Sequence, residues 1–254
     1  MLAERGYLIP AVNTETVDYV ACAVELARSI KQWHPTASVS LLTLGDYHNT
    51  VFDSVIQLPY GDCGGFANDW QCFAASPYRQ TIKLEADMIA ASPIDHYWTM
   101  FELRDVVISQ GCRTFYGQLA SSRFYRKFQD ENHLPDVYNA ITYWRKSLTA
   151  QQFFNLVRDI FRHWEKIKLA YKCPEDAPTT DCVYAVAAQI IGVEQVTLPL
   201  GVGPSIVHMK KNIQGCHSND WTQELVWERL NPGVKIQTVA QTGFFHYHKK
   251  TWIL

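Results

Sequence analysis

The stretch that decides the fold reads Ser76-Pro77-Tyr78-Arg79-Gln80-Thr81-Ile82-Lys83-Leu84-Glu85-Ala86-Asp87-Met88-Ile89. Its apolar residues lead into two carboxylates, Glu85 and Asp87, which are two positions apart. On an extended chain such side chains point to the same side, so the two acids would repel each other unless a cation lay between them. Mg²⁺ and Mn²⁺ are commonly held by one or two carboxylates together with substrate phosphates. The stretch therefore predicts a buried strand that ends at a seat for a cation carrying a diphosphate. The alternative is a solvated pair of loop acids.

The composition fits a soluble globular enzyme. Of the 254 residues, 47% are hydrophobic and 19% are charged, and the net charge is −2. This balance argues against a surface coated with basic residues for nucleic-acid binding, although it is compatible with a local basic groove. The seven cysteines are scattered and contain no Cys-x-x-Cys pair, so we expect reduced, buried thiols rather than a zinc ribbon. No apolar stretch reaches the ~20 residues that span a bilayer, which predicts a cytoplasmic protein without a membrane segment.

Hydrophobic periodicity predicts strands and helices in alternation. The expected strands cover residues 7–12, 39–44, 51–58, 81–90 and 106–109, and the expected helices cover 17–33, 151–169 and 180–191. Residues 61–70 are read as a plain loop, because their glycines lack the spacing of phosphate-binding motifs. Alternating strands and helices predict an α/β fold, in which helices flank a parallel or mixed sheet. No repeat or linker interrupts the chain, so residues 1–254 are expected to form a single domain.

The stretch from Tyr78 to Ile89 resembles the signature of nucleotide-sugar glycosyltransferases with the single-domain Rossmann-like fold, known as the GT-A type. That signature has an aromatic and a basic residue, an apolar strand, an Asp-x-Asp pair and a small apolar run. Here Glu85 stands in place of the first Asp. The resemblance implies a glycosyltransferase that uses a uridine-diphosphate sugar and Mn²⁺ or Mg²⁺. It implies Asp87 as the main metal ligand, Glu85 as a second ligand or a donor-ribose contact, and Arg79 as a donor-binding residue.

Two histidines are candidates for a third metal ligand, since neutral imidazole suits Mn²⁺ beside carboxylates. In the family-eight retaining glycosyltransferases, a late His followed by Lys-Pro-Trp supplies this ligand, and the Lys binds the diphosphate. His246 with Lys249 resembles that ending, although Thr stands where the family has Pro. His208 with Lys210 is the rival pair. The plain alternative for each histidine is a structural role.

Val12, Asn13 and Thr14 follow the first expected strand. In the resembled family this position receives the nucleotide base and ribose, so the resemblance implies that these three residues contact the donor. A simple helix-capping turn would explain the same residues equally well.

Two further acids are candidates for catalysis. Asp181 stands at the start of an expected helix, where the family has a catalytically placed acid at about this point in chain order. Favourable interaction with the helix dipole is the alternative. Asp136 and Asn139 lie in a segment that resembles the family's acceptor-side Asn-Ser-Gly segment. This implies that Asp136 or Asp181 orients the acceptor and that Asn139 contacts the sugar or the acceptor.

Over most of its length the chain also resembles small glycosyltransferases encoded by tailed phages, through residues 81–88, 134–140 and 245–248. Some enzymes of this kind glycosylate hydroxymethylated cytosine in phage DNA, with arabinose among the sugars. DNA is therefore an implied partner and the host cytoplasm an implied location. Arg123, Arg126 and Lys127 lie among aromatic residues, as a phosphate backbone and a flipped base would require, or form the solvated face of a helix. The alternatives are a glycan or protein acceptor, and a non-catalytic protein that binds nucleotide sugars.

Overall fold

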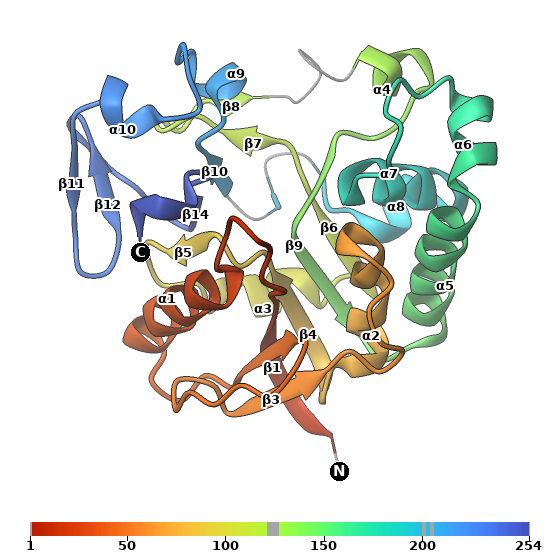
Figure 1. Cartoon of the computed structure of the whole chain (residues 1–254), viewed down its shortest axis with the longest axis horizontal. Coiled ribbons are helices and arrows are strands. Elements are labelled where there is room, and N and C mark those ends of the chain that lie inside the picture. The colour runs from red at the N-terminus through yellow and green to blue at the C-terminus, as the bar shows by residue number, and fades with distance from the viewer. Residues whose placement is uncertain (1, 121–126, 200–201, 204–205, 254) are drawn as a thin grey trace.

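The structure, a computed structural model, describes residues 2–120, 127–199, 202–203 and 206–253. Its main sheet has six strands in the order β3-β2-β1-β4-β9-β6 (Figure 1). These strands are β1 (Ala3–Pro10), β2 (Val39–Thr43), β3 (Ser54–Gln57), β4 (Tyr78–Leu84), β6 (Val106–Gln110) and β9 (Val137–Arg145). The first four are parallel, whereas β9 runs antiparallel to both of its neighbours. The predicted α/β fold with a mixed sheet is confirmed.

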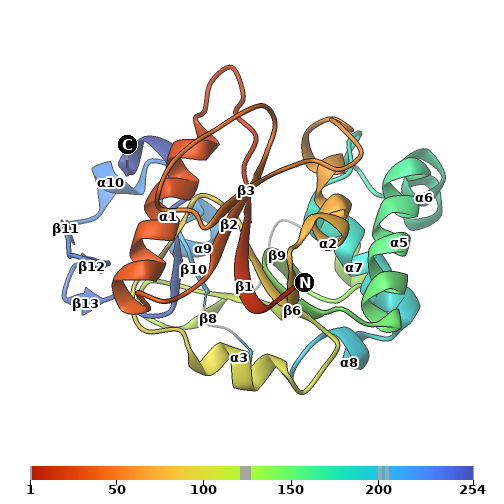
Figure 2. The same ribbon diagram turned by 90° about the horizontal axis from the view of Figure 1, so that it is seen from below.

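Helices cover both faces of this sheet, as Figure 2 shows for α1 and α5 on its two sides. The helices are α1 (Tyr19–Trp33), α2 (Cys72–Ala75), α3 (His96–Phe101), α4 (Lys127–Glu131), α5 (Leu148–Arg162), α6 (Trp164–Tyr171), α7 (Thr180–Ile191), α8 (Val193–Val196), α9 (Lys211–Gln214) and α10 (Trp221–Glu224). Tyr7 and Ile9 of β1 point into the core beneath α1 and α3, whereas Leu8 points into the core beneath α5 and α7 on the other face. Burial on both faces explains why the second half of β1 has three apolar residues in succession, Tyr7, Leu8 and Ile9.

Helix α7 begins and ends where the sequence predicts. The Thr179 side chain accepts a hydrogen bond from the Cys182 amide, and Gly192 ends the helix with a positive φ. The single helix expected over 151–169 is wrong, because the chain breaks at His163 into α5 and α6. The apolar stripe continues through Trp164 on both sides of the break, and neither Pro nor Gly stands there, so periodicity alone does not reveal it. Residues 65–71 form the 3₁₀ helix η1 (Gly65–Gln71) where a plain loop was expected.

The expected strand over 81–90 is also divided, and the division places the acidic pair. Strand β4 ends at Leu84, and β5 (Met88–Ala90) belongs to a second sheet in the order β5-β14-β10-β7-β8. The other strands of that sheet are β7 (Cys112–Arg113), β8 (Leu119–Ala120), β10 (Ile206–His208) and β14 (Phe244–His246). Glu85 and Asp87 therefore lie in a turn between two sheets, not along one strand as predicted. A third sheet joins β11 (Trp227–Arg229), β12 (Val234–Ile236) and β13 (Val239–Ala240).

The strand order contains a switch point between β1 and β4. From β1 the chain builds outward through β2 to β3, and it then returns to place β4 on the other side of β1. Open α/β sheets bind ligands outside the carboxyl ends of their strands at such a point. The segment 11–18 after β1 and the turn Glu85–Asp87 after β4 both lie at this edge. The chain within its described ranges contains no helix long and apolar enough to cross a bilayer. That residues 1–254 form one domain stays a prediction.

Candidate metal centre

Glu85, Asp87 and His246 form a cluster of possible metal ligands. Each offers one ligand atom, and these atoms all lie within 4.8 Å of one another. The turn after β4 supplies the two carboxylates, and β14 supplies the imidazole. Strand β14 pairs antiparallel with β5 so that His246 lies opposite Met88, the residue after Asp87. Pairing within the second sheet thus carries a histidine from the end of the chain to the acidic turn.

The distances in the cluster suit a hard divalent cation. His246 Nε2 lies 2.9 Å from Asp87 Oδ2, and His246 Nδ1 lies 3.7 Å from Glu85 Oε2. These two distances start from different ring nitrogens, and an imidazole binds a metal ion through one of them, so the fit to a cation rests on one ligand atom from each residue within 4.8 Å of the others. Two carboxylate oxygens and one imidazole nitrogen are a donor set that Mn²⁺ accepts, with positions left for water or phosphate oxygens. The residues present therefore fit Mn²⁺ or Mg²⁺.

The charges in the cluster are strongly coupled. Burial and the nearby Asp87 and Asp181 carboxylates raise the pKa of Glu85. Burial would also raise the pKa of Asp87, but the charges of His246 and Lys250 outweigh it and hold that pKa well below its usual range. Burial opposes the charge of His246, yet Asp87 and Glu85 raise its pKa. The imidazole lies between the two carboxylates and lowers the pKa of each of them.

Lys250, which the sequence analysis missed, is the lysine that contacts this cluster. Its Nζ forms an ion pair with Asp87 Oδ2, the oxygen that also faces His246. The predicted diphosphate ligand Lys249 instead pairs with Asp220 and lies 3.4 Å from Thr222 Oγ1. The signal was present in the sequence, because Lys250-Thr251-Trp252 is a closer match to Lys-Pro-Trp than a triplet beginning at Lys249.

His208, the rival ligand, lies behind His246 and outside the three-residue cluster. The two rings stack with centroids 4.3 Å apart, and His208 is 3% exposed. Burial and the charges of His246 and Lys210 hold its pKa well below the usual value. His248 meets the His208 ring edge-on at 5.8 Å. The charge of Lys210 lowers the pKa of both His208 and His248, and donor binding by Lys210 stays a prediction.

Asp181 lies on the α7 side of the same turn. Its Oδ1 accepts a hydrogen bond of 2.8 Å from the Asn139 amide, and its charge raises the pKa of Glu85. Asn139 is fully buried, and its Nδ2 has no hydrogen-bond partner among the described residues. Asp136 lies three residues before Asn139, lining a cavity of ≈ 610 Å³ together with Gln110 and other residues. The structure thus gathers Asp181 and Asn139 beside the cluster and gives Asp136 a cavity of ligand size.

The turn after β1 is held by its own side chains. Asn13 Oδ1 accepts from the Val20 amide at 2.9 Å, and Thr14 Oγ1 accepts from the Val17 amide at 3.1 Å. Val12 packs on the core under α5 and α7. The N-cap of α1 is Asp18, whose side chain accepts from the Ala21 amide, and Asn13 adds a bond to a second amide of the first turn. The exposed turn also lies at the ligand-binding edge, so contact with a nucleotide stays a prediction.

Arg79 is not brought to the site, and the prediction for it needs correction. It is the second residue of β4, at the end of the strand opposite Glu85, and six positions of extended chain separate the two by ~20 Å. Its guanidinium lies 4.0 Å from Glu4 on the exposed edge. Arg123 and Arg126 lie outside the described residues, as does the side chain of Lys127.

A buried ion pair lies under the turn, and sequence reasoning missed it. Lys83 Nζ is 2.7 Å from Asp69 Oδ1, and the hydroxyl of Tyr184 donates to the other oxygen of Asp69. Lys83 points to the α7 face of β4, two positions before Glu85. The pair joins η1, β4 and α7 and thereby fixes the segment that carries Asp181. Its only sequence signal is a lysine within an apolar strand.

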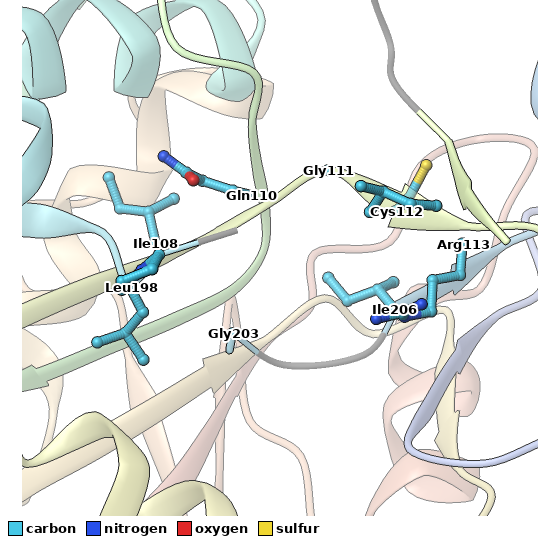
Figure 3. Close-up of a pocket in the computed structure, with 10 residues that line it drawn as sticks. Ile108, Gln110, Gly111, Cys112, Arg113, Leu198, Gly203 and Ile206 are labelled. Carbon is cyan, nitrogen blue, oxygen red and sulfur yellow. The ribbon is translucent and has the colours of Figure 1, made fainter. Parts of the chain in front are cut away.

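A small cavity lies where β6 leads into β7, between Ile108 and Leu198 on one side and Cys112 and Ile206 on the other (Figure 3). Its volume of ≈ 20 Å³ holds little more than a water molecule. It cannot accommodate a nucleotide sugar.

No protein-family model matches the chain, and no curated protein matches it. Among solved structures, the chain is similar to the galactosyltransferase LgtC in complex with donor and acceptor sugar analogues, at 9% identity over 71% of this chain and 70% of that chain, with a TM-score of 0.47. It is also similar to the glycosyltransferase GlyE of Streptococcus pneumoniae TIGR4, at 10% identity over 78% and 45% of the two chains, with a TM-score of 0.49. Mouse xyloside xylosyltransferase 1 matches at 9% identity over 78% and 85%, with a TM-score of 0.45.

Proposed function

We propose that this protein is a metal-dependent glycosyltransferase that moves a sugar from a uridine-diphosphate donor to a hydroxyl acceptor. The observation that carries the proposal is the Glu85–Asp87–His246 cluster at the switch point of the main sheet. A nucleotide bound at this edge would have its base and ribose near the turn after β1 and its diphosphate near the turn after β4. Those are the positions of the exposed Asn13–Thr14 turn and of the cluster.

Asp87, Glu85 and His246 would hold the Mn²⁺ or Mg²⁺ ion. A divalent cation held there neutralises the charge that develops on the departing diphosphate. Lys250 would bind the diphosphate as a second positive group, since it is the lysine in contact with the cluster. Lys210 and Lys249 are further candidates for that contact.

Asp181 would orient the acceptor hydroxyl or the donor sugar, since it lies beside Glu85 on the α7 side. The unpaired Nδ2 of Asn139 is a buried donor for which a sugar hydroxyl is a suitable partner. Asp136 would contact the acceptor from the cavity of ≈ 610 Å³, a volume in the range of small-molecule sites.

For the acceptor we propose the hydroxymethyl group of modified cytosine in DNA, with arabinose as one candidate sugar and the cytoplasm of a phage-infected cell as the location. The resemblance to phage enzymes supports this choice. A glycan or protein hydroxyl is the next candidate. The remaining alternative is a non-catalytic protein that binds nucleotide sugars, in which the cluster would bind the donor but not turn it over.

The test is a mass-spectrometric screen of uridine-diphosphate sugars with Mn²⁺ against hydroxymethylcytosine DNA and against the same DNA without the modification. We expect a mass increase of one sugar on the modified oligonucleotide alone. If the protein hydrolyses the donor but transfers the sugar to neither oligonucleotide, the DNA acceptor is rejected and the glycosyltransferase activity is retained. Absence of both transfer and hydrolysis for every donor would reject the enzyme.

A further inference from the structure

One carboxylate oxygen of Asp87 faces both an imidazole nitrogen and an ammonium group. Asp87 Oδ2 lies 2.9 Å from His246 Nε2 and also forms the ion pair with Lys250 Nζ. We propose that Lys250 is an internal counter-ion, which neutralises Asp87 until a divalent cation displaces it and only then becomes available to the donor diphosphate. This inference rests on the proposed function, because it concerns the order in which the same site fills.

The residues around Lys250 hold its side chain against Asp87. The side chain of Lys250 is 18% exposed and that of Asp87 is 7% exposed. An ammonium group that is largely removed from water needs an opposite charge nearby. The Lys250 side chain also passes within 5.9 Å of the centre of the Tyr19 ring, which favours a cation on its face. The adjacent Lys249 is held apart by Asp220.

The backbone beside Lys250 is held by packing, so only the Lys250 side chain has to move when it leaves Asp87. Lys250 begins the short 3₁₀ helix η3 (Lys250–Trp252). Trp252 packs against Trp221 at 5.4 Å and against Phe245 at 5.6 Å between ring centroids. A lysine on such an anchor can turn its four-carbon stem from the carboxylate to a ligand without moving the fold.

Occupancy of Asp87 by Lys250 and by a divalent cation is mutually exclusive. Both would lie against the same buried oxygen, and like charges a few ångströms apart in a dry site repel strongly. If the diphosphate binds before the cation, it faces two carboxylates, and the ammonium of Lys250 is still paired with Asp87. If the diphosphate binds after the cation, the charge of the carboxylates is already offset and the ammonium of Lys250 is available to it. Binding of the cation and of the diphosphate is therefore coupled through Lys250, and the coupling is reciprocal.

Amine labelling tests the displacement directly. The full-length protein is treated with an amine-reactive reagent, and the labelling rate of each lysine is read by peptide mass spectrometry without metal, with Mn²⁺, and with Mn²⁺ plus uridine diphosphate. We expect the rate at Lys250 to rise with Mn²⁺ and to fall again when the nucleotide is added. The rate at Lys249, which pairs outside the cluster, should not respond to Mn²⁺ alone. An unchanged rate at Lys250 when Mn²⁺ is bound would overturn the proposal.

Calorimetric titration of Lys250→Met supplies a second readout, with Lys168→Met as the matched control because Lys168 pairs with the exposed Asp176. We expect Lys250→Met to bind Mn²⁺ about 5-fold more tightly without nucleotide, and to bind uridine diphosphate in the presence of Mn²⁺ more weakly than the wild type. Equal Mn²⁺ affinity of Lys250→Met and wild type would refute the counter-ion and leave the proposed function standing. If neither protein binds Mn²⁺, the metal site itself is wrong and both proposals fall.

Discussion

His246 Nε2 lies 2.9 Å from Asp87 Oδ2, although 159 positions of sequence separate the two residues. The pairing of β14 with β5 sets this distance, because it places His246 opposite Met88. Glu85 follows the last residue of a main-sheet strand, whereas His246 belongs to the second sheet. The candidate metal centre therefore lies where two sheets meet, and it exists only when both are formed.

The two stacked histidines should differ in their effect on metal binding. His246→Ala removes a ligand, so we expect Mn²⁺ affinity to fall by about 100-fold or more. His208→Phe keeps a ring beside His246, so it should change the affinity by less than about 10-fold. The electron paramagnetic resonance signal of free Mn²⁺ measures both. A larger loss for His208→Phe than for His246→Ala would exchange the assigned roles.

Loss of the buried Lys83 should destabilise the protein strongly. Lys83→Met leaves Asp69 without its partner in a site where the lysine is 1% exposed. Breaking a buried pair in this way costs about 3–5 kcal/mol of unfolding free energy. The double variant Lys83→Met/Asp69→Leu leaves no unpaired charge and should recover a large part of that loss in urea denaturation. Additive losses from the two substitutions would show that the pair is not coupled.

Asp181→Asn separates the catalytic interpretation from the helix-dipole interpretation. Asparagine keeps the acceptor oxygen for the Asn139 amide, so the unfolding free energy should fall by less than about 1 kcal/mol. If Asp181 orients a reacting group, kcat should fall about 100-fold or more while the Mn²⁺ affinity changes little. Steady-state kinetics and a thermal melt on the same preparation decide between them. Unchanged kcat would leave Asp181 with a structural role only.

The Asp105–Arg145 ion pair predicts a pH dependence of stability away from the candidate site. Burial would raise the pKa of Asp105, but hydrogen bonds from Arg145 and Ser147 outweigh it and lower that pKa. A carboxyl whose pKa is lower in the folded state stabilises the protein above its unfolded pKa of about 3.9, and this contribution is lost as the pH falls through the lowered value. Asp105→Asn should therefore cost about 0.5–1 kcal/mol at pH 7 and nothing in strong acid. The urea unfolding midpoints of Asp105→Asn and of the wild type, measured from pH 7 down to strong acid, check this prediction. A difference between the two proteins that does not change with pH would contradict it.

Local sequence signals predicted much of the fold and of the candidate site. The cap at Thr179 and the terminator Gly192 fixed the bounds of α7, because both act within one turn of the helix. Glu85, Asp87 and His246 were chosen from their residue types as candidate metal ligands, and the structure brings the three side chains together, while their binding of a metal stays a prediction. By contrast, nothing in residues 81–90 reveals that the chain leaves one sheet at Glu85 and enters another at Met88. That change is decided by pairing with β14, which comes from the end of the chain.

The triplet Lys250-Thr251-Trp252 favours Lys250 over Lys249 as the match to Lys-Pro-Trp, although the contacts of the two lysines become visible only in the fold. In the structure Lys250 pairs with Asp87, whereas Lys249 pairs with Asp220. Arg79 matched a sequence pattern, but strand geometry places it at the opposite end of β4. Asn13 bonds to an amide in the first turn of α1, but Thr14 bonds to Val17 ahead of the helix, and nucleotide binding by either residue stays a prediction.

The central claim is that Asp87 seats a divalent cation which supports departure of a diphosphate. The direct measurement is the rate of uridine-diphosphate release from uridine-diphosphate sugars, with and without Mn²⁺, for the wild type, for Asp87→Asn and for the surface control Asp176→Asn. The account predicts Mn²⁺-dependent release by the wild type and by Asp176→Asn, and a loss of about 100-fold or more in Asp87→Asn. Equal, metal-independent release by all three proteins would contradict it.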